Sequence, residues 1–341
     1  MNETFDYTVD EFSPRVKIVG LGGGGCRLVN GLCLDDLQNV EKIGINTDTR
    51  INELGNLKIK LVIDTYGDNG CGGNVDLAKS IAKSNADKIG GILKNSDLTI
   101  LVSYFGEGTG TGFMEEAIKI VRENNGLPLP LILLPLAGTG DRRVAEKEFK
   151  NIKNICNYAI GIDYEVILKK YGSIRMKDAQ FLVFNRLNEI ISEYTTTLLK
   201  HTQFGNLTVN DLSTIVTHSG DSAVIRSEGP IEDTDKLVKF AMEYSMVEED
   251  IREKASGAWV LITVGDDVSQ SNVDILRRAI VENVLKPEAY GLTDMFIGVR
   301  IDNKYKGSAK IFGMLTGLDS IYRPPDRSIM GYPGMIDFVS R

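Results

Sequence analysis

The chain has 341 residues, of which 42% are hydrophobic and 25% are charged, and this is the composition of a globular protein rather than a disordered one. Its formal net charge of −8 argues against a general nucleic-acid binder, since no basic field would attract a phosphate backbone. No apolar run reaches membrane-spanning length and the first residues are acidic, so we expect a cytoplasmic protein with neither a membrane nor a nucleic acid as its direct partner.

The cysteines and histidines give no sign of a metal centre. The four cysteines show no paired spacing, and the two histidines are isolated from each other: Cys26, Cys33, Cys71, Cys156, His201 and His218. We therefore expect neither a metal site nor a disulfide framework.

The first predicted unit is an alternating strand over residues 15–19 that runs into a glycine-rich segment over residues 20–26. Five of the six residues from Gly20 to Gly25 are glycine, and residues 28–34 follow with rough helical spacing. A glycine-rich turn between a strand and a helix is a candidate anion cradle, because the free N–H groups and the positive end of the helix dipole face the ligand. Alone, it matches a Rossmann dinucleotide fingerprint only weakly.

Four further strands follow, each with a turn after it. Residues 42–46, 58–63, 98–102 and 130–135 are predicted strands, and the turns after them contain Thr47-Asp48-Thr49, Gly70–Asn74, Phe105–Gly112 and Gly138–Arg143. Residues 75–93 are predicted as one helix. Repeated units of this kind favour a parallel sheet with helices on both faces, and ligands of such sheets bind outside the carboxyl ends of the strands.

The segment Phe105–Gly112 is the strongest of these signals. Four glycines at alternate positions let the backbone approach phosphate oxygens closely, and the interleaved Thr109 and Thr111 add hydroxyl groups that can donate to phosphate. The segment therefore predicts a nucleotide phosphate site. The pattern Gly-x-x-x-x-Gly-Lys-Ser/Thr is absent, so a P-loop NTPase is not indicated.

The rest of the chain predicts a long helix over residues 176–200 and then a smaller α/β domain without glycine-rich phosphate loops. The predicted organisation is a nucleotide-binding domain over residues 1–175, a central linking helix over 176–202, a C-terminal α/β domain over 203–318 and a tail over 319–341. The predicted fold class is α/β, with an N-terminal Rossmann-like parallel sheet.

These motifs resemble the tubulin/FtsZ family of polymerising GTPases, and FtsZ-like proteins most of all. The family's Gly-Gly-Gly-Thr-Gly-Thr/Ser-Gly signature appears as Gly106–Gly112 with Glu107 in place of the second glycine, its first glycine loop as Gly20–Cys26 and its Asn-Thr-Asp element as Asn46-Thr47-Asp48. Its Gly-x-Gly-Gly-Asn loop appears as Gly70–Asn74. The motif-by-motif resemblance covers residues 16–221.

The resemblance implies a tubulin/FtsZ-like fold that binds GTP or GDP, with Mg²⁺, at the carboxyl edge of the sheet. The implied nucleotide-binding residues are Gly22, Gly23, Gly24, Gly25, Cys26, Asn46, Asp48, Gly72, Gly73, Asn74, Gly106, Glu107, Gly108, Thr109, Gly110, Thr111, Gly112, Thr139, Arg143, Phe181 and Asn185. It also implies head-to-tail self-assembly, in which the loop 204–211 of one subunit completes the site of the next and GTP is hydrolysed there. Asp211, Asn206 and Thr208 are the implied catalytic residues.

Several residues depart from the family pattern. Thr208 stands where FtsZ has the first of two acids in this loop, so we expect slow hydrolysis, because a threonine is no carboxylate base. By itself, Asp211 could equally be a helix cap. Thr139 replaces a glutamate that contacts ribose. Tyr164 and Arg186 fall where FtsZ has an asparagine and an aspartate that read guanine, so the guanine preference is implied by the resemblance alone.

Two alternatives stay open from the sequence. A family relative that does not hydrolyse GTP would act as a scaffold or regulator, and Thr208 and Arg186 favour it. A dinucleotide-binding oxidoreductase would need an acid after the second strand to hold ribose hydroxyls, and Asp48 could serve, but the segment 106–112 would have no role. The sequence does not distinguish cell division from DNA segregation or cell shape, nor does it identify adaptor proteins.

Overall fold

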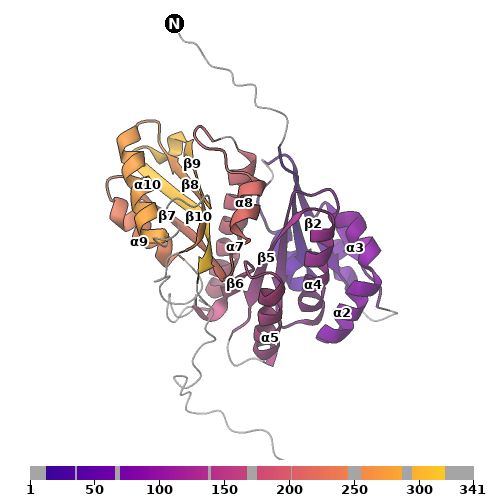
Figure 1. Ribbon diagram of the computed structural model, residues 1–341. Coiled ribbons are helices and arrows are strands. Elements are labelled where there is room, and N and C mark those ends of the chain that lie inside the picture. The colour runs from indigo at the N-terminus through magenta and orange to yellow at the C-terminus, as the bar shows by residue number, and fades with distance from the viewer. Residues whose placement is uncertain are drawn as a thin grey trace, which may run out of the picture.

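The computed structural model describes residues 13–34, 37–65, 70–136, 140–166, 175–200, 202–244, 255–285 and 294–318. Within these ranges the chain forms two sheets with a long helix between them (Figure 1). Thr139, His201 and the predicted tail 319–341 lie outside the described residues. None of the helices in the described ranges combines the length and the apolar character that crossing a bilayer requires.

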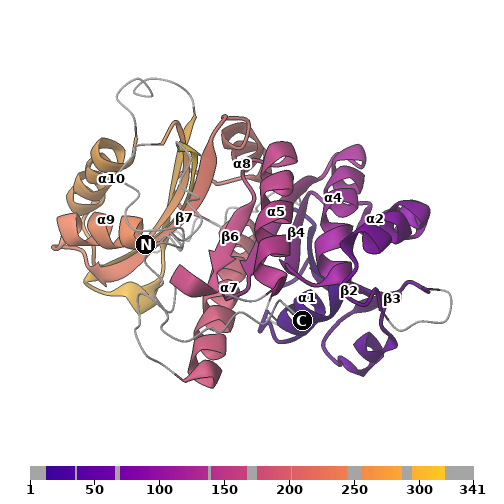
Figure 2. The same ribbon diagram turned by 90° about the horizontal axis from the view of Figure 1, so that it is seen from below.

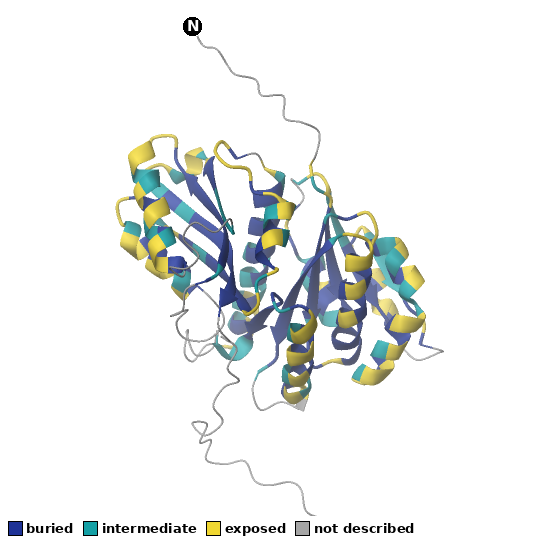
Figure 3. Ribbon diagram, viewed as in Figure 1, coloured by how far each residue is buried: buried dark blue, intermediate teal, exposed yellow. Residues whose placement is uncertain are grey.

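The first sheet has six strands, all parallel, in the order β3-β2-β1-β4-β5-β6. Its strands are β1 (Val16–Leu21), β2 (Val40–Asn46), β3 (Ile59–Val62), β4 (Leu98–Tyr104), β5 (Leu127–Leu134) and β6 (Ile160–Asp163). The central strands are buried along almost their whole length, as expected for a parallel sheet with both faces covered (Figure 3). The order reverses at β1, whose neighbours are β2 and β4, so the switch point of the sheet lies at the carboxyl ends of β1 and β4. We call this edge the crevice, because ligands of such sheets bind there.

In the described part of the chain, five helices accompany this sheet: α1 (Gly22–Asn30), α2 (Val75–Ser84), α3 (Ala86–Leu93), α4 (Gly108–Glu123) and α5 (Gly140–Ile155), with the short 3₁₀ turn η1 (Thr49–Glu53). The prediction of one helix over residues 75–93 is wrong, because Asn85 ends α2 and precedes α3, and its side-chain amide donates to the carbonyl of Ile81 at 2.9 Å. Two glycine-rich segments, expected as loops, form the first turns of α1 and α4.

The long helix α7 (Met176–Leu199) has 24 residues and, at about 1.5 Å per residue, spans about 36 Å. It lies between the two sheets, as the view from below also shows (Figure 2). Tyr194 packs against rings of the second sheet, 5.8 Å from Trp259 and 5.1 Å from Phe312 between centroids. At the far end, the buried Arg300 donates to the carbonyls of Thr196 at 2.9 Å and Lys200 at 2.8 Å, and so caps the helix.

The second sheet is smaller and mixed. Its strands β7 (Asp221–Pro230), β8 (Gly257–Val264), β9 (Met295–Ile301) and β10 (Ser308–Leu318) lie in the order β7-β10-β8-β9, and only β8 and β9 pair in parallel. Two helices, α9 (Thr234–Glu243) and α10 (Gln270–Val284), enclose a separate core on one face, whereas the other face joins the core around α7. The elements α8 (Val209–Ile215) and η3 (Asn303–Tyr305) complete this half.

The predicted fold class is therefore confirmed: an α/β chain with a parallel six-strand sheet, a long central helix and a smaller second sheet. The two halves are joined by polar contacts as well. Lys153 at the end of α5 pairs with Asp221 at the start of β7, with 2.7 Å between nitrogen and oxygen. The division of the chain at residues 175, 202 and 318 stays a prediction.

Candidate functional site

The two glycine-rich segments that follow β1 and β4 touch each other in the crevice. Gly22 has a φ of +70°, and a Cβ atom added there would lie 2.6 Å from the backbone nitrogen of Gly110. Only glycine fits a position with both a left-handed backbone and so close a neighbouring chain. The structure therefore brings the segments 20–26 and 106–112 together at one edge of the sheet.

The helices that begin in these segments have no capping side chain. Leu21 precedes α1 and Glu107 precedes α4, and neither side chain accepts a hydrogen bond from the first turn of its helix. The first N–H groups of a helix have no partner inside the helix, and the helix dipole makes this end positive. Two such ends that meet at one crevice are suited to hold an anion with several oxygens.

The other two predicted segments reach the same place. The hydroxyl oxygens of Thr47 and Thr109 lie 2.6 Å apart, and Thr47 Oγ1 lies 3.6 Å from the sulfur of Cys71. A Cβ atom added at Gly108 would lie 2.9 Å from Cys71 Cβ and 3.2 Å from the carbonyl carbon of Gly73. Four segments that are far apart in sequence thus gather around the crevice.

A turn at Gly106 closes this group of segments. Its N–H donates to the hydroxyl of Thr111 at 3.0 Å, and Thr111 is buried, so that hydroxyl supports the backbone of the turn. Gly106 has a φ of +103°, and a Cβ atom there would lie 2.8 Å from Cβ of Asp141, so α5 also begins beside this turn. Glu107 is exposed.

Three predicted polar residues have local partners. The carboxylate of Asp48 accepts from the backbone N–H of Arg50 at 2.9 Å, and hydrogen bonds from the Arg50 side chain and backbone lower the pKa of Asp48. The amide oxygen of Asn46 accepts from the N–H of Thr47 at 2.9 Å, and that of Asn74 caps α2 by accepting from Leu77 at 3.0 Å. These side chains shape the turns that carry them.

Arg142, which the sequence did not single out, connects the segment before α5 to β6. Arg142 is 2% exposed, and its guanidinium donates to both carboxylate oxygens of Asp163 at 2.7 and 2.6 Å and to the carbonyl of Pro135 at 2.7 Å. It ties the start of α5 to the end of β6. Its predicted neighbour Arg143 is exposed. The spacing of Arg142 to Glu146, one helical turn on, was the available signal for a paired side chain.

Aromatic side chains stand at the beginning of α7 and beside the glycine segments. Phe181 is 63% exposed, and Asn185, one turn on, is half-buried. The side chain of Tyr104 lies over Gly24, since a Cβ atom at Gly24 would be 2.7 Å from Tyr104 Cβ. Burial, and then the nearby Tyr164, raises the pKa of Tyr104 to about 12, so the Tyr104 hydroxyl stays protonated at neutral pH.

Arg186 points away from Phe181. Its guanidinium carbon lies 3.8 Å from the ring centroid of Tyr244, which follows α9, and its nitrogen pairs with Glu189 at 3.0 Å. Five residues along a helix correspond to about 140° of rotation, which accounts for the opposite direction. The arginine therefore joins α7 to the second half of the molecule.

The predicted catalytic loop begins α8 with a capping box. Thr208 Oγ1 accepts from the N–H of Asp211 at 3.1 Å, while Asp211 Oδ2 accepts from the Thr208 N–H at 2.8 Å and its hydroxyl at 2.9 Å. Asp211 therefore takes part in capping α8. Asp211 Oδ1 accepts no hydrogen bond from the residues that the structure describes. Asn206 Oδ1 accepts from the hydroxyl of Thr202 at 2.5 Å.

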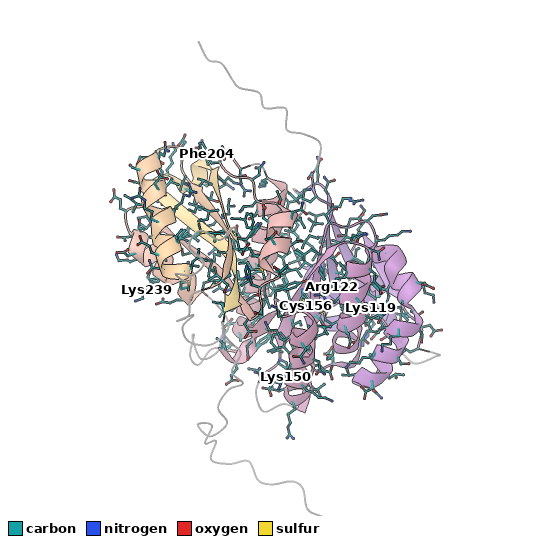
Figure 4. The ribbon with its side chains drawn as sticks, viewed as in Figure 1. Lys119, Arg122, Lys150, Cys156, Phe204 and Lys239 are labelled. Carbon is teal, nitrogen blue, oxygen red and sulfur yellow. The ribbon has the colours of Figure 1, made fainter. Side chains whose placement is uncertain are left out.

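The loop 204–211 does not join the glycine segments. Helix α7 starts after β6, whose carboxyl end lies at the crevice edge, and runs back before the loop begins, so about 36 Å of helix separates the two groups. Phe204 lies at the upper rim of the molecule in Figure 4. Within the described ranges, no three His, Cys, Asp or Glu residues are grouped so that they could hold a metal ion.

Comparison with known proteins agrees with this geometry. Residues 15–172 match the family model "Tubulin/FtsZ family, GTPase domain". Among curated proteins, Cell division protein FtsZ 2 of Haloferax volcanii is 26% identical over 317 residues, which cover 91% of this chain and 77% of that protein. Cell division protein FtsZ of Mycoplasmopsis pulmonis is 26% identical over 92% of this chain and 80% of its own length.

Solved structures share the fold. An empty FtsZ dimer of M. jannaschii superposes with a TM-score of 0.76 at 19% identity, over 90% of this chain and 89% of that chain. CetZ2 from Haloferax volcanii, solved as a GTPγS-bound protofilament, superposes with a TM-score of 0.72 at 16% identity, over 89% and 93%. Residues 15–172 therefore match the GTPase domain of the tubulin/FtsZ family, and the chain as a whole shares the fold of FtsZ.

Proposed function

We propose that the protein is a GTP-binding cytoskeletal GTPase that assembles head-to-tail into filaments. One observation carries the proposal: four distant segments meet at the crevice, where α1 and α4 begin without capping side chains. The contact of Gly22 with Gly110 holds these helix starts side by side, and the pair Thr47–Thr109 joins the turn after β2 to α4. The phosphates of GTP or GDP would take the free N–H groups, and Phe181 would lie against the base.

The chemistry of the crevice fits a nucleotide with Mg²⁺. Glycine at residues 22–25 leaves backbone without side chains for phosphate oxygens to approach, and Thr109 offers a hydroxyl beside it. When bound, Mg²⁺ would neutralise phosphate charge, and the phosphate oxygens themselves would be its main ligands. Asp48 is engaged by Arg50, which weakens the alternative of a dinucleotide-binding oxidoreductase that needs a free acid at this position.

Hydrolysis requires a second copy of the chain. The loop 204–211 is separated from the crevice of its own chain by the length of α7, so Asp211 can reach a nucleotide only in a neighbouring subunit. There its free Oδ1 would orient the attacking water, while Thr208 keeps Oδ2 in place and Asn206 completes the loop. Two solved relatives, CetZ2 and TubZ of Bacillus thuringiensis, are titled as protofilaments, which supports the same arrangement here.

A second candidate function is a filament scaffold that binds GTP without hydrolysing it appreciably. The observation that favours it is the capping box, because Thr208 supplies no second carboxylate and half of the Asp211 carboxylate is used for the cap. Thr208→Asp separates the two candidates. A large gain in phosphate release would show that the missing acid limits turnover, whereas steady release by the wild type with no gain would favour the GTPase.

The proposal is tested by assembly and by the bound ligand. We expect pelleting and light scattering to show assembly with GTP, and weaker or no assembly with GDP or ATP, at tens of micromolar protein. Denaturing the purified protein and separating the released nucleotide by chromatography should yield GTP or GDP. A chain that releases no guanine nucleotide and never assembles would contradict the proposal. A role in cell division, which the names of the curated relatives state for those proteins, belongs to the same proposal, and so does a cytoplasmic location.

A further inference from the structure

Phe204 combines a fixed backbone with an exposed ring. Its N–H donates to the carbonyl of Val299 at 3.1 Å, and its own carbonyl accepts from the Val299 N–H at 2.7 Å. The neighbouring Gln203 accepts from the N–H of Ile301 at 2.8 Å through its side chain. Although these bonds add the segment to the edge of β9, the Phe204 side chain is 64% exposed.

The next residue makes this placement rigid. Gly205 has a φ of +70°, and a Cβ atom there would lie 3.0 Å from the carbonyl oxygen of Ile297. A Cβ atom at Gly298 would in turn lie 2.6 Å from the Gly205 carbonyl oxygen. The backbone on both sides is packed too closely to shift, so little conformational freedom remains to be lost when the ring becomes covered.

Phe204 belongs to a small apolar surface. Residues paired across two strands place their side chains on the same face, and so do residues two apart in one strand. Phe204, its partner Val299, and Ile301 therefore share a face, and Ile301 is 39% exposed. We call Phe204 and Ile301 the β9-edge patch. It is continuous with the loop 204–211.

The opposite end of the molecule also exposes an apolar side chain. Leu77 is 45% exposed in the first turn of α2, directly after the segment Gly70–Asn74 that meets the crevice. A surface that binds a different surface on an identical copy forms a head-to-tail contact, which repeats into a filament. The β9-edge patch and Leu77 lie at the two ends that such a contact would bring together.

We propose that Phe204 is the aromatic anchor of self-association: the β9-edge patch of one chain packs against the crevice end of a second copy, beside Leu77. The inference rests on the proposed head-to-tail assembly and adds the side chains that hold it. A rigid aromatic ring at the centre of a contact is the kind of residue whose removal weakens binding most. The partner is a second copy because the patch adjoins the loop that must reach a neighbour's nucleotide.

The test compares two exposed phenylalanines. Phe204→Ala should raise the protein concentration needed for GTP-dependent assembly by about tenfold or more, the effect of losing an aromatic anchor. Phe240→Ala is the matched control, because Phe240 is 52% exposed on α9, which carries neither the β9-edge patch nor a crevice segment, and should leave this threshold unchanged. Both variants should bind GTP below the threshold as the wild type does, and should show the same circular dichroism.

A mixing experiment tests the direction of the contact. Phe204→Asp damages one end and Leu77→Asp damages the other, so neither variant should dimerise alone. An equal mixture should form dimers and nothing longer, measured by sedimentation velocity, since each pair retains one intact contact.

An unchanged threshold for Phe204→Ala, an equal rise for Phe240→Ala, or a mixture that stays monomeric would overturn the inference while leaving the proposed function intact. A wild-type chain that never assembles would contradict both.

Discussion

The helices at the crevice and the helix after the long central helix begin in opposite ways. Helices α1 and α4 start with glycines and have no capping side chain, whereas α8 starts with the reciprocal pair Thr208 and Asp211. A helix start that caps itself needs no ligand, and one that does not is available to an anion. The difference indicates which end of this molecule is built to bind and which is built to present a fixed carboxylate.

The largest expected effect is on nucleotide affinity, through the uncapped starts of α1 and α4. Gly22→Ala places a Cβ atom 2.6 Å from Gly110 in a backbone conformation that alanine avoids, so we expect nucleotide affinity to fall at least about hundredfold. Titration with a fluorescent GTP analogue measures this. Gly91→Ala is the control, because no atom lies within 4 Å of its Cβ position in α3, and it should leave affinity unchanged and raise stability by about 0.5–1 kcal/mol. Normal affinity of Gly22→Ala would show that the crevice is not the binding site.

The next effect concerns the capped helix. Asp211→Asn removes the charge that would polarise water, and we expect the rate of phosphate release to fall about 10²–10⁴-fold, with GTP affinity of the monomer unchanged. The neighbouring Asn210, exposed on the same turn, supplies the control Asn210→Ala, which should stay within about twofold of the wild type. If both variants release phosphate normally, Asp211 serves the helix and not the reaction.

A smaller effect compares the two kinds of helix start directly. Thr208→Val removes a capping hydroxyl and should lower the free energy of unfolding by about 0.5–2 kcal/mol. Glu107→Ala changes the residue before α4, whose side chain makes no capping bond, and should cost little. Urea unfolding measures both, with Thr208→Ser as the conservative control. An equal loss of unfolding free energy for Thr208→Val and Glu107→Ala would contradict the difference between the starts of α8 and α4.

The smallest expected effect is a difference in reactivity among the cysteines, which chemical labelling measures. Burial raises the pKa of Cys26, in the first turns of α1, to about 12, and that of Cys156 to about 11, so both thiols stay protonated and unreactive near pH 8. Cys33 is exposed and should react with a maleimide in the native protein, whereas Cys26, Cys71 and Cys156 should react only after denaturation. Mass spectrometry counts the labels. Rapid native labelling of Cys26 would mean that the crevice opens in solution.

The sequence was sufficient for the sheet and for the meeting of the glycine segments, because turns at the carboxyl ends of parallel strands share one edge. It also marked the long central helix, whose apolar face is wide. The sequence did not predict which of several available partners a charged side chain contacts. Arg186 and Arg142 each have neighbours of opposite charge in sequence, but Tyr244 and Asp163 come near only through the tertiary fold.

The candidate site shows the same limit. Thr208 and Asp211 lie three residues apart, a spacing typical of a capping box, and the pattern alone does not say whether the acid caps, catalyses or does both. The exposure of Phe204 was invisible in sequence, because an aromatic residue next to a glycine more often belongs to a core. Only the pairing with Val299 reveals a ring held outward.

The cap that Arg300 forms on α7 connects this helix to the β9-edge patch. Arg300 grips the last carbonyls of the helix, and its neighbour Val299 holds the backbone of Phe204. Helix α7, strand β9 and Phe204 are thus connected to one another, and Phe181 lies near the opposite end of α7. A displacement of α7 along its axis would therefore be transmitted to the β9-edge patch, the surface that we propose contacts a second copy.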